Sequence, residues 1–216
     1  MTNPTSCPKA PAAALDRLRG LLGRGQRVML GLVGAPGAGK STLAEALRRE
    51  FEAIAQIVPM DGFHLANVQL RRLGRAERKG APDTFDAAGY VELLRRLRRQ
   101  QAGETVYAPE FRREIEEPVA GAIAIEAETR LLIAEGNYLL LDQGAWAPVA
   151  GLLDEVWYLD IDDAFRRERL IGRHRQFGRS LEAATEWVDR SDEANARVIA
   201  ATRSRANWHL AWGREP

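Results

Sequence analysis

A glycine-rich segment constrains the fold of this chain more than any other feature: Gly34-Ala35-Pro36-Gly37-Ala38-Gly39-Lys40-Ser41. It follows the apolar run Val28–Val33, which is typical of a strand buried on both faces. It precedes a stretch from Lys40 to about Phe51 whose leucines recur at helical spacing. The segment fits the pattern G-x-x-x-x-G-K-[ST] at every fixed position, and it lies between a strand and a helix as that pattern requires. We therefore predict an α/β fold in which this segment is a phosphate-binding loop, a Walker A motif.

The residue types of this loop predict how it holds a nucleotide. The glycines let successive backbone N–H groups point at phosphate oxygens, and the positive end of the helix dipole adds to them. Lys40 is expected to reach the β- and γ-phosphates, and the Ser41 hydroxyl to face Mg²⁺. The sequence lacks the guanine-binding pattern N/T-K-x-D. A GTPase is therefore not expected. The loop indicates a nucleoside triphosphate, and the predicted binding residues are Gly34, Ala35, Pro36, Gly37, Ala38, Gly39, Lys40, Ser41 and Thr42.

The rest of the chain alternates between predicted strands and helices. The expected elements are a helix from Ala12 to Gly23, strands over Ile54–Met60, Leu131–Ala134 and Val156–Asp160, a helix capped by Asp86, extended segments over Thr105–Phe111 and Ala122–Glu128, and helices over Ala164–Phe177 and Leu181–Ser204. This alternation predicts a three-layer α/β/α sandwich with a mainly parallel sheet, and the late helices suit a lid. We expect a single domain over residues 12–216 after a disordered lead-in over residues 1–11.

Composition and charge narrow the classes of partner. Of 216 residues, 31 are Lys or Arg and 30 are Asp or Glu, so the net charge is +1. Without a basic excess, and without aromatic residues interleaved among basic ones, nucleic-acid binding is not expected. No apolar run reaches about 18 residues, so no contact with a membrane is expected. Cys7 is the one cysteine, which excludes an internal disulfide and favours a cytoplasmic location. The oligomeric state stays open, with a homodimer as one alternative.

Two acidic residues stand at the ends of predicted strands. Asp61 follows the strand Ile54–Met60, which is expected to neighbour the strand that leads into the phosphate loop. Its carboxylate would then accept a proton from an attacking hydroxyl or hold the water of the metal. Glu135 follows Leu131–Ala134, in the Walker B position that faces Mg²⁺. Each carboxylate could instead cap a turn with its side-chain oxygen.

Three arginines recur along one predicted helix. Arg166, Arg169 and Arg173 share one face because they stand at i, i+3 and i+7. Such a stripe could close over phosphates and neutralise the charge that develops during transfer. The alternative is a solvated basic face that pairs with nearby acidic residues.

Together these motifs resemble the family of P-loop small-molecule kinases that contains uridine kinase, phosphoribulokinase and bacterial type I pantothenate kinase. In particular, the chain resembles a branch of bacterial proteins labelled fructose transport system kinase or nucleoside-kinase-like. The resemblance runs from about Gln26 onward. Besides the phosphate loop, the segments that show it are Met60–His64, Arg78–Asp86, Tyr107–Arg112, Glu135–Tyr138, Arg169–His174 and Ser191–Asn195.

The resemblance implies catalytic and metal-binding roles. Asp61 would be the catalytic base for the acceptor hydroxyl, and Ser41 with Glu135 would hold Mg²⁺. The residues that would bind the transferring phosphoryl group are Lys40, Arg169 and Arg173.

The resemblance also implies where ligands contact the chain. Asn195 would lie near the adenine. The acceptor pocket would comprise Asp61, His64, Lys79, Tyr107, Phe111, Arg112 and Tyr138. This chain has Tyr107-Ala108-Pro109 where pantothenate kinase has Tyr-Ser-His, so a substrate-contacting histidine of that enzyme is missing. Neither pantothenate nor uridine is therefore singled out as the acceptor.

The expected function is an ATP- and Mg²⁺-dependent transfer of the γ-phosphoryl group to a hydroxyl of a small metabolite. The acceptor would be a sugar, a nucleoside or a pantothenate-like alcohol. The alternative is an ATP-binding regulatory module without small-molecule kinase activity. Asp61 separates the two hypotheses, because a base beside an acceptor pocket is needed by a kinase and has no use in a switch.

Overall fold

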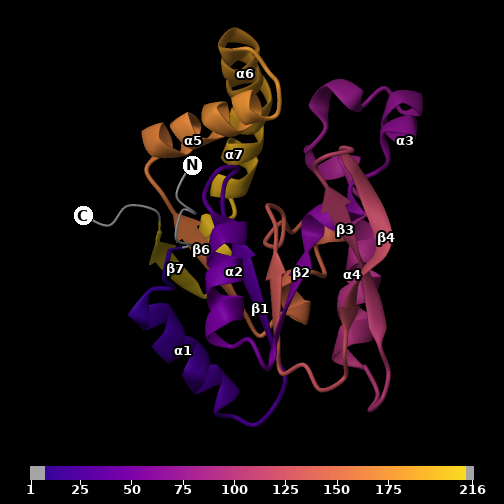
Figure 1. Ribbon diagram of the computed structural model, residues 1–216, viewed down its shortest axis with the longest axis vertical. Helices are drawn as coiled ribbons and strands as arrows, with labels where there is room; N and C mark the ends of the chain where they lie inside the picture. The colour runs from indigo at the N-terminus through magenta and orange to yellow at the C-terminus, as the bar shows by residue number, and fades with distance from the viewer. Residues whose placement is uncertain (1–7, 213–216) are drawn as a thin grey trace, which may run out of the picture.

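The computed structural model describes residues 8–212, and a parallel sheet of five strands lies at its centre (Figure 1). The strand order is β2-β5-β1-β6-β7, and every neighbouring pair is parallel. The strands are β1 (Val28–Val33), β2 (Ala55–Pro59), β5 (Leu131–Glu135), β6 (Glu155–Asp160) and β7 (Trp208–Ala211). The predicted α/β fold with a mainly parallel sheet is confirmed.

Helices and a hairpin cover the two faces of this sheet, which makes three layers (Figure 1). One layer contains α1 and α2, packed on Leu30 and Trp157; the other contains α4 and a hairpin, packed on Met29 and Leu132. Because successive side chains of a strand point to opposite faces, a strand between two layers must be apolar throughout, as β1 is. The helices are α1 (Ala12–Leu22), α2 (Lys40–Glu50), α3 (Asn67–Arg72), α4 (Ala87–Arg98), α5 (Asp163–Gln176), α6 (Leu181–Trp187) and α7 (Glu193–Ala200). The predicted cap of α4 is confirmed, because the Asp86 carboxylate accepts the Gly89 N–H at 2.8 Å.

The strand order corrects one expectation about the site. The strand before Asp61 does not neighbour β1, because β5 lies between β1 and β2. Glu135, at the end of β5, is in register with Leu32 of β1 and with Pro59 of β2. The Walker B carboxylate therefore lies between the phosphate loop and Asp61.

The extended segments between α4 and β5 pair with each other. They form an antiparallel hairpin of β3 (Val106–Arg112) and β4 (Glu117–Ile125). β4 begins and ends earlier than the strand predicted over residues 122–128. The hairpin packs closely on the turn that follows β2. A Cβ on Gly62 would lie 2.2 Å from the Pro109 carbonyl oxygen, so only glycine allows this approach.

The expected helix over residues 181–204 is continuous from Leu181 to Ala200, but it contains a π-helical turn and ends earlier than expected. The structure divides it into α6, a π-helical turn over Val188–Asp192, and α7, which ends at Ala200. The wider turn places an extra residue in the helix and directs Asp192 inward, where its carboxylate bonds to His174 Nε2 at 2.9 Å. Together α5, α6 and α7 form an arch above the carboxyl ends of the strands, which we call the lid (Figure 1).

The expected disordered lead-in falls largely on residues 1–7, which lie outside the described residues. Ala10, from the same segment, is buried in the core beneath α1. Among residues 8–212 no helix is long and apolar enough to cross a membrane.

Candidate active site

A cavity of about 670 Å³ opens at the carboxyl ends of β1, β5 and β2, where ligands of open parallel sheets bind. Its volume is in the range of small-molecule sites. Its wall is built from the phosphate loop, the ends of two strands, the hairpin and the lid. The predicted site residues that line it are Pro36, Gly37, Lys40, Ser41, Asp61, His64, Lys79, Phe111, Glu135, Arg173 and Asn195.

The phosphate loop has the backbone that its glycines predict. Gly37 and Gly39 have φ angles of 81° and 85°, a backbone conformation that residues with a side chain rarely adopt. A Cβ on Gly37 would also lie 2.8 Å from Leu170 Cγ and 2.9 Å from the Arg166 carbonyl oxygen. The loop is thus shaped by glycine and held closely by α5.

Lys40 begins α2, and its side chain folds back over the loop. Its ammonium donates to the carbonyl oxygens of Gly34, at 2.9 Å, and Ala35, at 3.2 Å. Burial lowers the pKa of Lys40 to about 8, against the opposing charges of Glu135 and Asp61. A buried ammonium with neutral carbonyl partners is stabilised when an anion binds beside it. Lys40 is therefore placed to receive phosphate.

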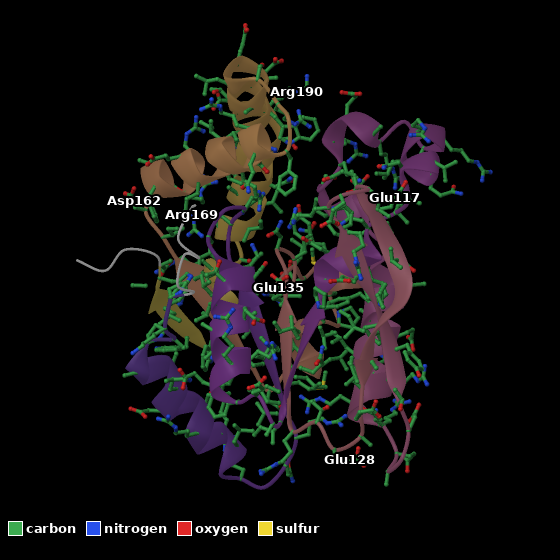
Figure 2. All side chains as sticks on the ribbon, viewed as in Figure 1. Glu117, Glu128, Glu135, Asp162, Arg169 and Arg190 are labelled. Atoms are coloured by element: carbon green, nitrogen blue, oxygen red, sulfur yellow. The ribbon has the colours of Figure 1, made fainter. Side chains whose placement is uncertain are left out.

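Ser41 and Glu135 face each other across the site, and Figure 2 shows Glu135 above the strand ends, beside α2. The Ser41 hydroxyl lies 3.3 Å from both carboxylate oxygens. Burial and the charge of Asp61 raise the pKa of Glu135. Residues 8–212 contain no cluster of three His, Cys, Asp or Glu that could hold a metal alone. Mg²⁺ does not need one, because it binds through one or two protein oxygens and the phosphates of its nucleotide. A hydroxyl and a carboxylate at this place fit that ion.

Asp61 lies in a 3₁₀ turn directly after β2, and it lines the same cavity. Its Oδ2 is 3.6 Å from Nη2 of Arg113, which belongs to the turn between β3 and β4. His64 is fixed beside it, with Nδ1 at 2.9 Å from the Asp61 backbone oxygen and its ring 4.8 Å from that of Phe111. Burial lowers the pKa of His64, so its imidazole is neutral near pH 7. A carboxylate therefore stands beside a wall of aromatic rings.

Lys79 joins two loops at the rim of the cavity. Its ammonium donates to Oδ1 of Asn67 at 2.9 Å and to the Glu116 backbone oxygen at 2.6 Å. It also lies 5.0 Å from the centre of the Phe111 ring. Lys79 thus fastens the segment after α3 to the tip of the hairpin.

The arginine stripe of α5 divides into different roles. Arg166 is fully buried and pairs with Asp163 and Glu193, so it is neither a solvated nor a phosphate-facing group. Arg173 lines the cavity, where burial and the nearby charge of Arg113 lower its pKa. Arg169 lies outside the cavity wall, below α5 in Figure 2, near Gly39 of the loop.

Three residues of the implied acceptor pocket are not in the cavity wall. Tyr107 is 60% exposed on β3, and Arg112 pairs with Glu110 on the outside of the hairpin, at 2.6 Å. Tyr138 is buried, and its hydroxyl donates to the Gly80 carbonyl oxygen, so it supports the wall from behind. Tyr107 and Arg112 are five residues apart, so simple alternation would put them on opposite faces of the strand. The register shift between Ala108 and Glu110 allows both side chains to be exposed.

The lid supplies two predicted residues of the wall, Arg173 and Asn195, and several unpredicted ones. Asn195, the implied adenine contact, is buried on α7 and lines the cavity. His174, Arg179 and Trp187 line it as well, and the Arg179 guanidinium lies 4.2 Å from the centre of the Trp187 ring. Sequence reasoning missed Arg179 and Trp187 because no sequence pattern indicates that an arginine stacks on a tryptophan beside a π-helical turn.

Two further residues were missed by sequence reasoning. Arg113 lines the cavity in place of its neighbour Arg112, and only the position of the hairpin turn distinguishes them. Trp212 follows β7, and its indole N–H donates to the Gly39 carbonyl oxygen at 3.2 Å. A tryptophan so far along the chain from the glycine-rich motif carries no sequence signal of this contact.

The comparisons with known proteins agree with this geometry. Residues 29–214 match the sequence profile of the "Phosphoribulokinase / Uridine kinase family". A Schizosaccharomyces pombe protein named "putative uridine kinase" is 39% identical over 190 residues, which span 83% of this chain and 80% of that protein. The crystal structure of a "putative fructose transport system kinase" from Silicibacter sp. TM1040 has a TM-score of 0.81 at 38% identity, and the match covers 92% of this chain and 98% of that one.

A more distant structure shares the fold. YFH7 from Saccharomyces cerevisiae, a "putative P-loop containing kinase", has a TM-score of 0.78 at 22% identity, and the match covers 94% of this chain and 98% of that one. Fold and site together define a P-loop small-molecule kinase. The chain belongs to the phosphoribulokinase/uridine kinase family, as the motifs predict.

Proposed function

We propose that the chain transfers the γ-phosphoryl group of ATP, with Mg²⁺, to a hydroxyl group of a small acceptor. One observation supports this most strongly. The phosphate loop, the Ser41–Glu135 pair and Asp61 line one cavity, together with an aromatic wall that continues past Asp61. A regulatory module, the alternative, would have no use for a carboxylate between its nucleotide and a second pocket.

Each group has a defined part in the proposed reaction. The loop N–H groups and Lys40 hold the β- and γ-phosphates, and Arg173 faces the phosphoryl group from the lid. Asp61 accepts the proton of the acceptor hydroxyl while the oxygen of that hydroxyl forms the new bond to phosphorus. The bond from phosphorus to the β–γ bridging oxygen breaks, and ADP leaves with that oxygen. Mg²⁺, held by Ser41 and Glu135, would neutralise charge on the phosphates.

The site supports in-line transfer without a covalent intermediate. The neutral imidazole of His64 and the ring of Phe111 exclude water on the acceptor side of Asp61. The lid, which carries Arg173 and Asn195, covers the nucleotide side. Positioning and electrostatic stabilisation therefore account for the proposed catalysis.

The test is ADP formation from MgATP over a panel of sugars, nucleosides and other small alcohols. Asp61→Asn should lower acceptor-dependent turnover by about 10²- to 10⁴-fold, the usual contribution of a general base. The matched control is Asp16→Asn on α1, because Asp16 is exposed and pairs only with Arg19 of its own helix among the described residues. The control should turn over as wild type does. Tight ATP binding without stimulation by any acceptor would contradict the proposal and favour the regulatory module.

A further inference from the structure

Arg113 is a cation beside the proposed base, and its ion pair with that base is long. It lies in the turn between β3 and β4, and it lines the cavity. Its Nη2 is 3.6 Å from Oδ2 of Asp61, which is longer than a hydrogen bond. Among residues 8–212 its guanidinium forms no hydrogen bond, so its N–H donors are available to a ligand.

The other lysines and arginines of the cavity wall already have a use. Arg179 stacks on the Trp187 ring, 4.2 Å from its centre. Lys79 donates to Asn67 and to the backbone of Glu116, and it thereby joins two loops. Lys40 and Arg173 face the phosphates in the proposed reaction. Arg113 remains, and it is carried by the same hairpin as Phe111.

The hairpin tip holds Arg113 in a defined place. Glu116 has a φ of 52°, a left-handed conformation that the surrounding contacts must maintain. The backbone N–H of Asn67 donates to both carboxylate oxygens of Glu117, at 3.1 and 3.0 Å, and Lys79 binds the Glu116 carbonyl. A tip fixed in this way can present a guanidinium with the directionality that recognition requires.

We propose that Arg113 binds an anionic group of the acceptor, a carboxylate or a phosphate, so that the physiological acceptor is an acid that also carries the reacting hydroxyl. This inference rests on the proposed function and names the class of its acceptor. A guanidinium matches both anions because it presents two parallel N–H donors. In the free enzyme Arg113 stays near Asp61. An acceptor anion draws the guanidinium toward itself, and the Asp61 carboxylate then faces the acceptor hydroxyl.

The experiment compares acceptors that differ in charge. ADP formation is measured with glycerol against glycerate and glycerol 3-phosphate, and with ribose against ribonate and ribose 5-phosphate. The carboxylates and the phosphates distinguish the two sources of charge. Each acceptor is tested with wild type, Arg113→Gln, Arg113→Lys and the control Arg95→Gln. Arg95 is a partly exposed arginine of α4 that pairs with Glu92 of the same helix.

The expected result has three parts. Wild type turns over acidic acceptors in preference to their neutral counterparts. Arg113→Gln raises the KM for the acidic acceptor by about 10- to 100-fold, the effect of losing a charged hydrogen-bonded pair, and leaves the KM for ATP unchanged. Arg113→Lys recovers part of the loss, and Arg95→Gln behaves as wild type.

Three outcomes would overturn the inference, and they are distinguishable. If neutral acceptors alone are phosphorylated, the proposed function stands and the anionic class is wrong. If Arg113→Gln lowers kcat equally for acidic and neutral acceptors, or raises the KM for ATP, Arg113 binds the phosphoryl group rather than the acceptor. If no compound in either set stimulates ADP formation although ATP binds, the proposed function and this inference fail together.

Discussion

In the proposed function the cavity has a nucleotide half, around the phosphate loop, and an acceptor half, around Asp61, and the two are built in different ways. The nucleotide half depends on one contiguous motif, whose glycines and Lys40 act through backbone groups of the same loop. The acceptor half gathers Asp61, Lys79 and Arg113 from separate segments that only the hairpin and the loop after α3 bring together. A contiguous loop can keep its chemistry while the segments opposite it change. The comparison explains how a fold can retain ATP and vary its acceptor.

The largest effect should come from Lys40. We expect Lys40→Met to lower kcat by about 10³-fold or more, because the transition-state charge loses its cation inside a buried site. Turnover at saturating ATP measures this, and the melting temperature should remain near that of wild type. A loss below tenfold would mean that the motif does not supply the main electrostatic stabilisation, and the contrast between the halves would disappear.

The pH dependence of ATP binding should identify the same group. The pKa of Lys40 is about 8 in the fold against 10.5 for an ordinary lysine. Between these values the unfolded chain binds a proton that the folded chain has lost, so the contribution of Lys40 to stability rises with pH. ATP binding needs the charged form, so its Kd should rise by up to about tenfold per unit above pH 8. Titrations of wild type and Lys40→Met from pH 7 to 10 measure this; parallel curves would contradict it.

Lys79 provides the matched substitution in the acceptor half, because it too donates to a backbone carbonyl. Lys79→Met should raise the KM for the acceptor by about 3- to 10-fold, since the hairpin tip loses hydrogen bonds that hold it. The KM for ATP should not change. Steady-state kinetics with each substrate varied in turn separates the two constants. An equal rise in both would show that the halves are not independent.

The smallest effect should come from Trp212, which touches the loop from outside the cavity. Trp212→Phe keeps an aromatic side chain, though a smaller one, and removes the N–H that donates to Gly39, so we expect the KM for ATP to rise by about 2- to 10-fold. Trp208→Phe is the control, because Trp208 packs on the ring of Trp157, with centroids 4.8 Å apart. That variant should change the melting temperature and leave the KM for ATP as it is. Identical nucleotide kinetics in both variants would contradict a role for Trp212.

The fold and the nucleotide half could be predicted from the sequence because their signals are local. A buried strand, a glycine-rich turn and an amphipathic helix follow one another directly, so Lys40 and Ser41 needed no long-range information. Glu135 was identified by the same logic, since it ends an apolar strand. The order of the strands was not accessible, because no local pattern distinguishes β5 from β2 as the neighbour of β1.

In the acceptor half, a shift of one residue along a strand changes which side chain faces the cavity. Arg112 and Arg113 are adjacent, and the point at which β3 ends decides which of them lines the cavity. Tyr107 faces outward because of the same alternation. The π-helical turn between α6 and α7 escaped prediction because no residue pattern distinguishes such a turn from the α-helix around it.

The position of β5 between β1 and β2 sets a length. Neighbouring strands lie about 4.8 Å apart, so the strand that carries the phosphate loop and the strand that carries Asp61 are separated by about 9 to 10 Å. That interval leaves room for a phosphoryl group and an attacking oxygen in line between the two ends. A sheet with β1 and β2 adjacent would halve it. In the proposed reaction, the spacing of the strands would therefore set the distance over which the phosphoryl group moves, before any side chain contributes.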